Sequence, residues 1–270
     1  MRLFVAALAI CFGLFAAAAR AQQPVDLELV LAVDVSRSMD FDEQLIQRKG
    51  YAEAFRSREV IGAITSGLHG SIAVTYMEWA ASSLTRVIVP WTVIDSEASS
   101  LAFADALDQQ LPQRLSRTSI SGAMDAAEML FADSGFSGMR RVVDISGDGP
   151  NNEGLPVTVS RDRLVGNGII INGLPLMVRP SSYGYGITNL DEYYEDCVIG
   201  GPGSFMIGVR NWDEFPQAVR RKLVLEIAGS VPRVERAALM APVQDKGRPT
   251  VDCLVGERIW QQRMRGWEWR

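Results

Sequence analysis

The stretch LELVLAVDVSRS, residues 27–38, decides the fold. Except for one glutamate, residues 27–33 are all apolar, which is typical of a strand buried on both faces of a sheet. Three oxygen-bearing side chains follow at alternate positions: Asp34, Ser36 and Ser38. Alternate residues of an extended backbone point to the same side, so these three can converge on one point. That point lies at the carboxyl end of a strand, where open α/β sheets bind their ligands.

Strand-like and helix-like segments alternate along the rest of the chain. Strands are predicted at residues 71–79, 85–93, 141–146, 168–174 and 204–209, and helices at residues 41–58, 97–110, 119–132, 158–165 and 211–228. This alternation predicts an α/β fold, doubly wound around a mostly parallel central sheet with helices on both faces. The short turn around residues 81–83 can join only antiparallel neighbours, so one strand runs against the others.

The chain is expected to be exported. Arg2, an apolar run over residues 3–19 and the small-x-small pattern at residues 19–21 are typical of a signal peptide cleaved after Ala21. The alternative is a membrane anchor, but the apolar run is short for a span. We therefore expect a periplasmic or secreted protein without stable membrane insertion, and we divide the chain into a leader over residues 1–21, a domain over residues 22–229 and a C-terminal extension over residues 230–270, packed on the domain.

Export also decides how the cysteines are interpreted. Cys11 leaves with the leader, and Cys197 and Cys253 remain as one even pair. In an oxidising compartment such a pair predicts a disulfide, with two buried free thiols as the alternative.

The charge of the chain excludes one class of partner. The full sequence has a formal net charge of −5, and loss of Arg2 and Arg20 with the leader makes the mature chain −7. General nucleic-acid binding requires a basic face, so we expect no nucleic-acid partner.

Two further segments supply oxygen atoms at the same edge of the sheet. Asp148 lies in a Gly-Asp-Gly turn directly after the predicted strand 141–146, and Thr118 precedes the predicted helix 119–132. If the two central strands are neighbours, Asp148 lies over the same crevice as Asp34. Carboxylates and hydroxyls form a hard set of ligands that suits Mg²⁺, Mn²⁺ or Ca²⁺ and not zinc or copper.

The order Asp34-x-Ser36-x-Ser38, then Thr118, then Asp148 resembles the metal-ion-dependent adhesion site of von Willebrand factor A domains. The order of strands and helices is also similar to that fold, including the one antiparallel strand. Residues 117–122 and 143–152 further resemble an exported bacterial branch of this superfamily.

The resemblance implies a binding mechanism. Ser36, Ser38 and Thr118 would supply hydroxyl ligands, and Asp34 and Asp148 would act directly or through water. The cation would be Mg²⁺, with Mn²⁺ or Ca²⁺ as alternatives, and its open position would accept a carboxylate from a protein partner. The chain would then be an adhesion-type binding module that performs no chemistry of its own.

Several simpler roles compete with the metal site. Ser38 and Thr118 could each cap a helix, and Asp148 could merely shape its turn. The rival functions are a metal-dependent hydrolase and a periplasmic complex-assembly factor. A hydrolase would need a nucleophile or base beside the metal. The only histidine, His69, lies outside the motif loops, and no Gly-x-Ser-x-Gly motif is present.

Three other features have more than one interpretation. Asp144 lies within an apolar strand and needs a partner; we expect an arginine or a backbone hydrogen bond, with support of the metal ligands as the alternative. The tail carries Trp260 and two later tryptophans among arginines; we expect it to pack on the domain, and an interface is the alternative. The insertion 183–194, rich in tyrosine, is expected beside the crevice.

Overall fold

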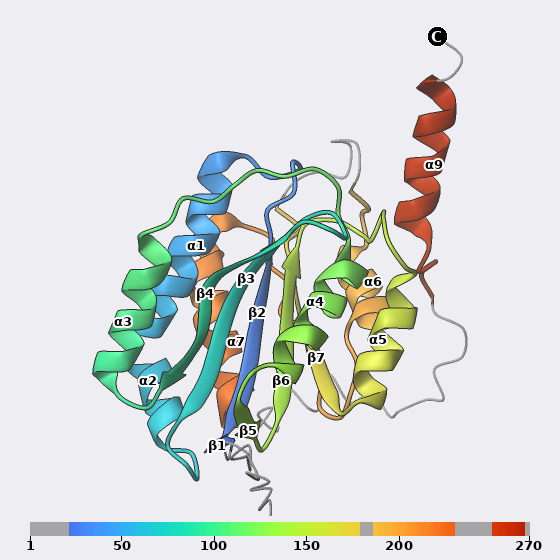
Figure 1. Cartoon of the computed structure of the whole chain (residues 1–270). Helices are drawn as coiled ribbons and strands as arrows, with labels where there is room; N and C mark the ends of the chain where they lie inside the picture. Colours follow the sequence, from blue (N-terminus) through green and yellow to red (C-terminus); the bar gives the residue numbers. More distant parts are fainter. Residues whose placement is uncertain (1–21, 179–185, 230–249, 268–270) are drawn as a thin grey trace, which may run out of the picture.

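The computed structural model describes residues 22–178, 186–229 and 250–267 (Figure 1). The expected leader and Cys11 lie outside the described residues, as do residues 179–185, which include the start of the insertion, residues 230–249 of the extension and Trp269.

A five-stranded sheet forms the centre of the molecule, with strand order β4-β3-β2-β6-β7. Its strands are β2 (Leu27–Asp34), β3 (Ile72–Trp79), β4 (Thr85–Ile94), β6 (Arg141–Gly147) and β7 (Ile169–Pro175). Every neighbouring pair is parallel except β3 and β4, which are antiparallel. The predicted fold class and its one antiparallel strand are confirmed.

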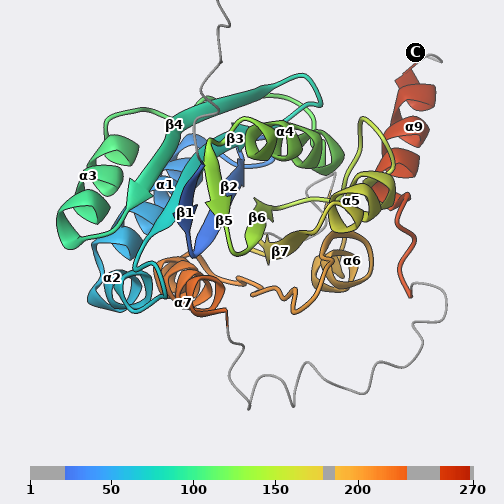
Figure 2. The same ribbon diagram turned by 60° about the horizontal axis from the view of Figure 1, so that its bottom comes forward.

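Helices cover both faces of this sheet, as the turned view in Figure 2 shows. One layer contains α1 (Phe41–Arg56), α2 (Arg58–Thr65), α3 (Glu97–Asp108) and α7 (Phe215–Ala228), and the other contains α4 (Ile120–Ala132), α5 (Val157–Gly166) and α6 (Leu190–Tyr193). A short π-helix, Tyr194–Val198, continues α6, and a 3₁₀ turn, Trp212–Glu214, precedes α7. A small parallel pair, β1 (Gln23–Val25) and β5 (Phe136–Gly138), lies apart from the main sheet.

Strand β2 is central because its side chains are apolar on both faces. Leu29 and Leu31 belong to the core beneath α1 and α7, whereas Val30 and Ala32 belong to the core beneath α4 and α5. All eight residues of β2 are buried. Burial on both faces holds the strand in place, so the loop that follows Asp34 starts from a rigid point.

One predicted strand, residues 204–209, is wrong. The segment does run beside β7, but it pairs with it only at two isolated positions, Gly173 with Met206 and Leu176 with Val209. A continuous parallel ladder would need a backbone N–H at Pro175, which proline lacks. The ladder is therefore interrupted where the sequence places that proline.

The predicted helix 41–58 corresponds to α1, which ends two residues earlier, at Arg56. Ser57 adopts an extended conformation (φ −79°, ψ 142°), ends α1 and caps α2 by accepting a hydrogen bond from the Val60 N–H. Helix α2, the small pair β1–β5 and the helical turns within the insertion were likewise not predicted.

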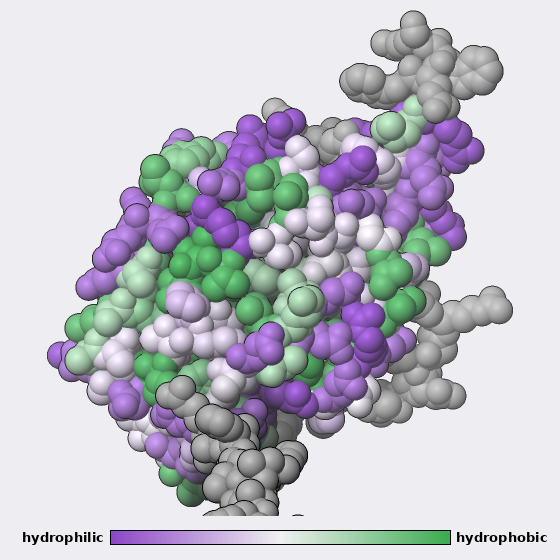
Figure 3. Space-filling model, viewed as in Figure 1, coloured by the Kyte–Doolittle hydropathy of each residue, from purple (hydrophilic) through white to green (hydrophobic). Residues whose placement is uncertain are grey.

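The predicted disulfide is confirmed, because Cys197 and Cys253 are joined with a Cα–Cα distance of 5.5 Å. It attaches the last helix, α9 (Val255–Trp267), to the π-helix that follows α6. The first turns of α9 contact the body, whereas its residues from 261 to 265 are exposed and it projects outward (Figure 1). The side of α9 seen in Figure 3 is mostly hydrophilic.

Candidate metal centre

The loop after β2 brings two serine hydroxyls together. Asp34 ends the strand and is fully buried, and its Oδ1 accepts a hydrogen bond from the Ser36 N–H at 2.6 Å. This turn places the Ser36 and Ser38 hydroxyl oxygens 2.8 Å apart. The alternation seen in the sequence therefore does gather these side chains at the carboxyl end of β2.

The fourth residue joins them from the neighbouring strand. Strands β2 and β6 pair in parallel, with Val33 opposite Ser146, so both loops leave the same edge of the sheet. The Ser38 hydroxyl donates to Asp148 Oδ1 at 2.6 Å, across 110 residues of sequence. Ser36, Ser38 and Asp148 thus form one hydrogen-bonded cluster with Asp34 behind it.

Thr118 lines the same cleft as this cluster. Its N–H donates to Asn152 Oδ1 at 3.1 Å, and its carbonyl accepts from the Asn152 N–H at 2.8 Å. Asn152 follows Asp148 along the chain, so this pair of bonds fixes the segment before α4 against the loop after β6.

The hydroxyls of Ser38 and Thr118 do not cap a helix, although capping was the simpler interpretation of both residues. The N-cap of α1 is Asp40, which forms a capping box with Glu43: the backbone N–H of each residue donates to the side-chain carboxylate of the other. The N-cap of α4 is Ser119, whose hydroxyl accepts from the Gly122 N–H. Capping is therefore not the role of Ser38 or Thr118.

The electrostatics of Asp34 are those of a carboxylate suited to a cation. Burial raises the pKa of Asp34 well above its usual range, and the nearby Asp148 carboxylate raises it further. Its Oδ2 is buried and has no hydrogen-bond partner among the described residues. A buried carboxylate oxygen without a partner is costly, and a divalent cation would compensate it. The residues present, carboxylates and hydroxyls, fit Mg²⁺ or a similar hard ion.

Two buried glutamines of α1 hold the loop, and neither was predicted to do so. Gln44 Nε2 donates to the Val35 carbonyl at 3.0 Å, and Gln47 Nε2 donates to the Asp34 carbonyl at 3.3 Å. The Ser146 hydroxyl in turn donates to Gln47 Oε1 at 3.3 Å. Their spacing of three residues places both on the inner face of the helix, and this was the signal available in the sequence.

A tyrosine from the insertion lies directly behind the site. A Cβ atom at Gly147 would lie 3.0 Å from the Tyr194 hydroxyl and 3.1 Å from Asp34 Oδ2, so a larger residue there would crowd both side chains. Burial raises the pKa of Tyr194 well above its usual value, and Asp34 adds to this effect. Tyr194 therefore presents a neutral phenol next to Asp34.

A cleft of about 740 Å³ opens above the cluster. Its walls come from the loop after β2, the segment before α4, the loop after β6, the insertion and the first turns of α9. Residues on these walls include Ser38, Arg117, Asp148, Ile187 and Trp260. The expected position of the insertion beside the crevice thus holds for residues 186–188 and Leu190.

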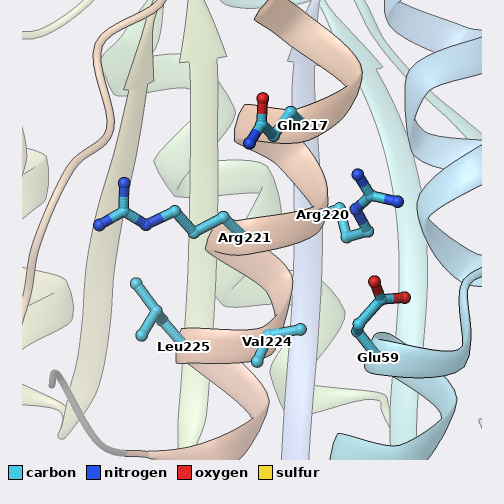
Figure 4. Close-up of a pocket in the computed structure, with 6 residues that line it drawn as sticks. All are labelled: Glu59, Gln217, Arg220, Arg221, Val224 and Leu225. Atoms are coloured by element: carbon cyan, nitrogen blue, oxygen red, sulfur yellow. The ribbon is translucent and has the colours of Figure 1, made fainter.

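A second hollow of about 400 Å³ lies elsewhere, between α2 and α7 (Figure 4). Glu59 and Arg220 line it from facing helices, and Val224 and Leu225 form part of its wall. It contains none of the five candidate ligands. The histidine His69 is also remote from the metal site, because it lies exposed just before β3, at the opposite end of the sheet.

Asp144 has a partner of a different kind from the one expected. Lys222 of α7, rather than an arginine, places its Nζ 2.6 Å from Asp144 Oδ1, and both side chains are almost completely buried. The same ammonium group contacts Glu226. The simpler interpretation, an ion pair, therefore describes the structure.

Comparison with known proteins gives a family and a fold. The family model described as "Protein of unknown function (DUF1194)" matches residues 24–231. A search of curated proteins finds no match.

Solved structures share the fold at low sequence identity. Proximal thread matrix protein 1 from the mussel byssus, with a zinc-occupied MIDAS motif, is 15% identical with a TM-score of 0.57, over 77% of this chain and 49% of that one. A von Willebrand factor type A structure from Catenulispora acidiphila is 13% identical with a TM-score of 0.52, over 75% and 43%. The pilus adhesin SpaC from Lactobacillus rhamnosus GG is 12% identical with a TM-score of 0.56, over 76% and 31%.

The chain therefore spans about half the length of the mussel protein and less of the other two. At these identities the matches establish the fold, and the resemblance to von Willebrand factor A domains is confirmed at that level.

Proposed function

The chain belongs to the DUF1194 family and has the von Willebrand factor A fold, and on this premise we propose that it is a divalent-cation-dependent module that binds a protein partner. Asp34, Ser36, Ser38, Thr118 and Asp148 would hold the ion, most readily Mg²⁺. The observation that carries the proposal is the cluster of Ser36, Ser38 and Asp148 with the buried Asp34 carboxylate behind it.

The binding step follows from how few charges surround the ion. Three of the five ligands are neutral hydroxyls and the two carboxylates can act through water, so a divalent cation would remain receptive to one more anionic oxygen from the cleft. A Glu or Asp side chain of the partner would supply it. Two of the solved structures support this proposal by their printed descriptions, one by a zinc-occupied MIDAS motif and one as a pilus adhesin. Both descriptions accord with a binding role rather than with catalysis.

The place of action is part of the proposal. We expect the leader over residues 1–21 to direct the chain to the periplasm or the exterior. Among the described residues, no helix has both the length and the apolar character needed to cross a membrane. The disulfide is consistent with an oxidising compartment.

Calorimetric titration of Mg²⁺ and Mn²⁺ into the chelator-treated mature protein tests the site. We expect binding to the wild type, and its loss in Asp34→Ala and in Asp148→Ala, because each variant removes a charged ligand. Asp162→Ala is the matched control, since Asp162 is an exposed aspartate of α5 paired only with Arg161 among the described residues.

Two results would contradict the proposal. One is a folded wild type that binds neither cation, alone or with acetate present to complete the coordination. The other is unchanged affinity in both ligand variants.

A further inference from the structure

Three arginine side chains surround the mouth of the candidate metal centre. Arg37 comes from the loop after β2, whereas Arg114 and Arg117 come from the segment before α4, and all three line the cleft. The two segments lie side by side because the Leu115 N–H donates to the Val35 carbonyl at 2.9 Å. The Arg114 guanidinium also donates to the Arg37 carbonyl at 2.5 Å, which draws the two exposed arginines together.

The charge in this cleft opposes the charge of the whole chain. The chain carries a net charge of −5, yet Asp148 is the only acidic residue among the described residues that line the cleft. A fourth arginine on the wall, Arg210, is paired with Asp191. Over the described part of the chain, none of the other three arginines forms an ion pair. A bound divalent cation would make the cleft more positive still, and such a field attracts anionic partners.

Arg117 is held in place at a cost in backbone energy. With φ of 76°, it is the only residue other than glycine in the left-handed region among the described residues. That conformation costs about 1–2 kcal/mol for a residue with a side chain. Its guanidinium lies 3.7 Å from the centre of the Trp260 ring in α9. A guanidinium stacked by its face keeps the N–H groups at its edge available for an anion.

The rest of the cleft suits a polypeptide. Leu176, Met177 and Ile187 provide an apolar wall beside the arginines, which an aliphatic stem can contact. Guanidinium groups match carboxylates with two parallel hydrogen bonds.

We propose that Arg37, Arg114 and Arg117 form a second anion-binding subsite, so that the cleft selects a polypeptide segment with at least two acidic side chains. One carboxylate would complete the coordination of the cation, and the second would pair with the arginines. This inference rests on the proposed function and adds the class of ligand to it.

Two end-capped octapeptides test the subsite, one with a single glutamate among serines and one with four glutamates. With Mg²⁺ present, we expect the wild type to bind the four-glutamate peptide about tenfold or more tightly than the other, measured by calorimetry. The double variant Arg37→Gln/Arg114→Gln should reduce this preference to about fourfold, the advantage that four equivalent carboxylates have over one by number alone. Its affinity for Mg²⁺ alone should not fall, because neither arginine is among the candidate ligands and the loss of two nearby positive charges favours a cation.

Arg58→Gln is the control, since Arg58 is exposed at the start of α2, far from the cleft. Equal binding of the two peptides by the wild type overturns the subsite, as does an undiminished preference in the double variant. Binding of neither peptide by a folded, Mg²⁺-loaded wild type also overturns it. Tighter binding of an octathymidylate than of the acidic peptide would assign the arginines to a nucleic acid instead.

The same titrations separate the subsite from the metal centre. Suppose that the four-glutamate peptide binds equally well with a chelator present, and that the double variant abolishes this binding. The subsite then stands and the cation-dependent function fails. If binding instead needs Mg²⁺ but is unaffected by loss of the arginines, the cation-dependent function stands and the subsite fails.

Discussion

At the scale of single residues, the backbone strain at Arg117 can be measured directly. Arg117→Gly and Arg117→Ala both remove the guanidinium that stacks on Trp260, but only alanine retains a Cβ at φ 76°. We expect the glycine variant to be more stable than the alanine variant by about 1 kcal/mol, because glycine adopts the left-handed region without strain. Urea unfolding of the two variants measures the difference directly.

This comparison has a built-in check. Glycine also loses more conformational entropy on folding than alanine does, an effect of opposite sign. An alanine variant as stable as the glycine variant would therefore mean that the strain at Arg117 is no larger than this entropic cost.

The convergence of Asp34, Ser36 and Ser38 follows from periodicity, whereas the position of Tyr194 behind them does not. Asp34, Ser36 and Ser38 alternate in extended backbone, so their convergence could be expected from the sequence, and the hydrogen bonds of the serines show it. Gln44 contacts the backbone nine residues earlier in the chain, whereas Tyr194 reaches the site from across the whole domain. No local sequence pattern predicts the contact of Tyr194, because it depends on how the insertion folds back onto the domain.

At the scale of elements, the packing of α7 on the sheet depends on a buried charged group. Lys222 lies between Asp144 of β6 and Glu226 of its own helix, and Asn172 of β7 donates to Glu226 Oε1 at 2.9 Å. One ammonium thus faces two carboxylates without access to water. Burial raises the pKa of Glu226 to about 7, and the charge of Asp144 adds to the shift, which Lys222 only partly offsets.

This shift predicts how stability changes with pH. A carboxyl with a pKa of about 7 when folded and 4.5 when unfolded binds more protons in the folded state between these values. Its contribution to stability is therefore complete below pH 4.5 and is lost as the pH rises to about 7, a difference of roughly 3 kcal/mol.

Glu226→Gln removes this titration while it keeps an oxygen for Lys222 and Asn172. We expect the Tm of the variant, relative to the wild type, to rise steadily between pH 5 and pH 8 in calorimetric scans. Glu53→Gln, an exposed change on α1, should give no such trend. Parallel curves for Glu226→Gln and the wild type would show that Lys222 fully neutralises Glu226.

The wrong strand prediction and the missed break between helices share a cause. Residues 204–209 have the composition of a strand, but the residue that interrupts the ladder, Pro175, belongs to the neighbouring strand. The composition of a segment does not indicate whether the neighbouring strand can form hydrogen bonds with it. The break between α1 and α2 is similar, because Ser57 is an ordinary residue within a helix until its hydroxyl caps the next one.

At the scale of the whole molecule, the disulfide decides how firmly α9 is held. Apart from the Cys197–Cys253 bond, its first turns contact the body through the packing of Val255 on the core, the hydrogen bond from Asn151 to Glu257 at 2.7 Å and the stacking of Trp260 on Arg117. These contacts are few compared with those of a core helix. The closed loop spans 56 residues, for which chain entropy gives a stabilisation of about 4 kcal/mol.

We expect Cys197→Ala/Cys253→Ala to lower the Tm and to speed amide hydrogen exchange over residues 255–260 by about tenfold or more. Exchange in β2 under native conditions should stay slow, because its core is built almost entirely from elements other than α9. Treatment of the wild type with a reductant should reproduce the effect and leave the double variant unaltered. Unchanged exchange over residues 255–260 would mean that the noncovalent contacts suffice.

The Cys197–Cys253 bond also determines what a protease can release from the chain. It closes a covalent ring, so hydrolysis of any single peptide bond between residues 197 and 253 yields two polypeptides that remain one molecule. Trp260 would stay tethered beside Arg117 after such a cut. On a gel the cleaved protein would migrate as two bands only after reduction, and in mass spectrometry without reduction it would differ from the intact chain by one water.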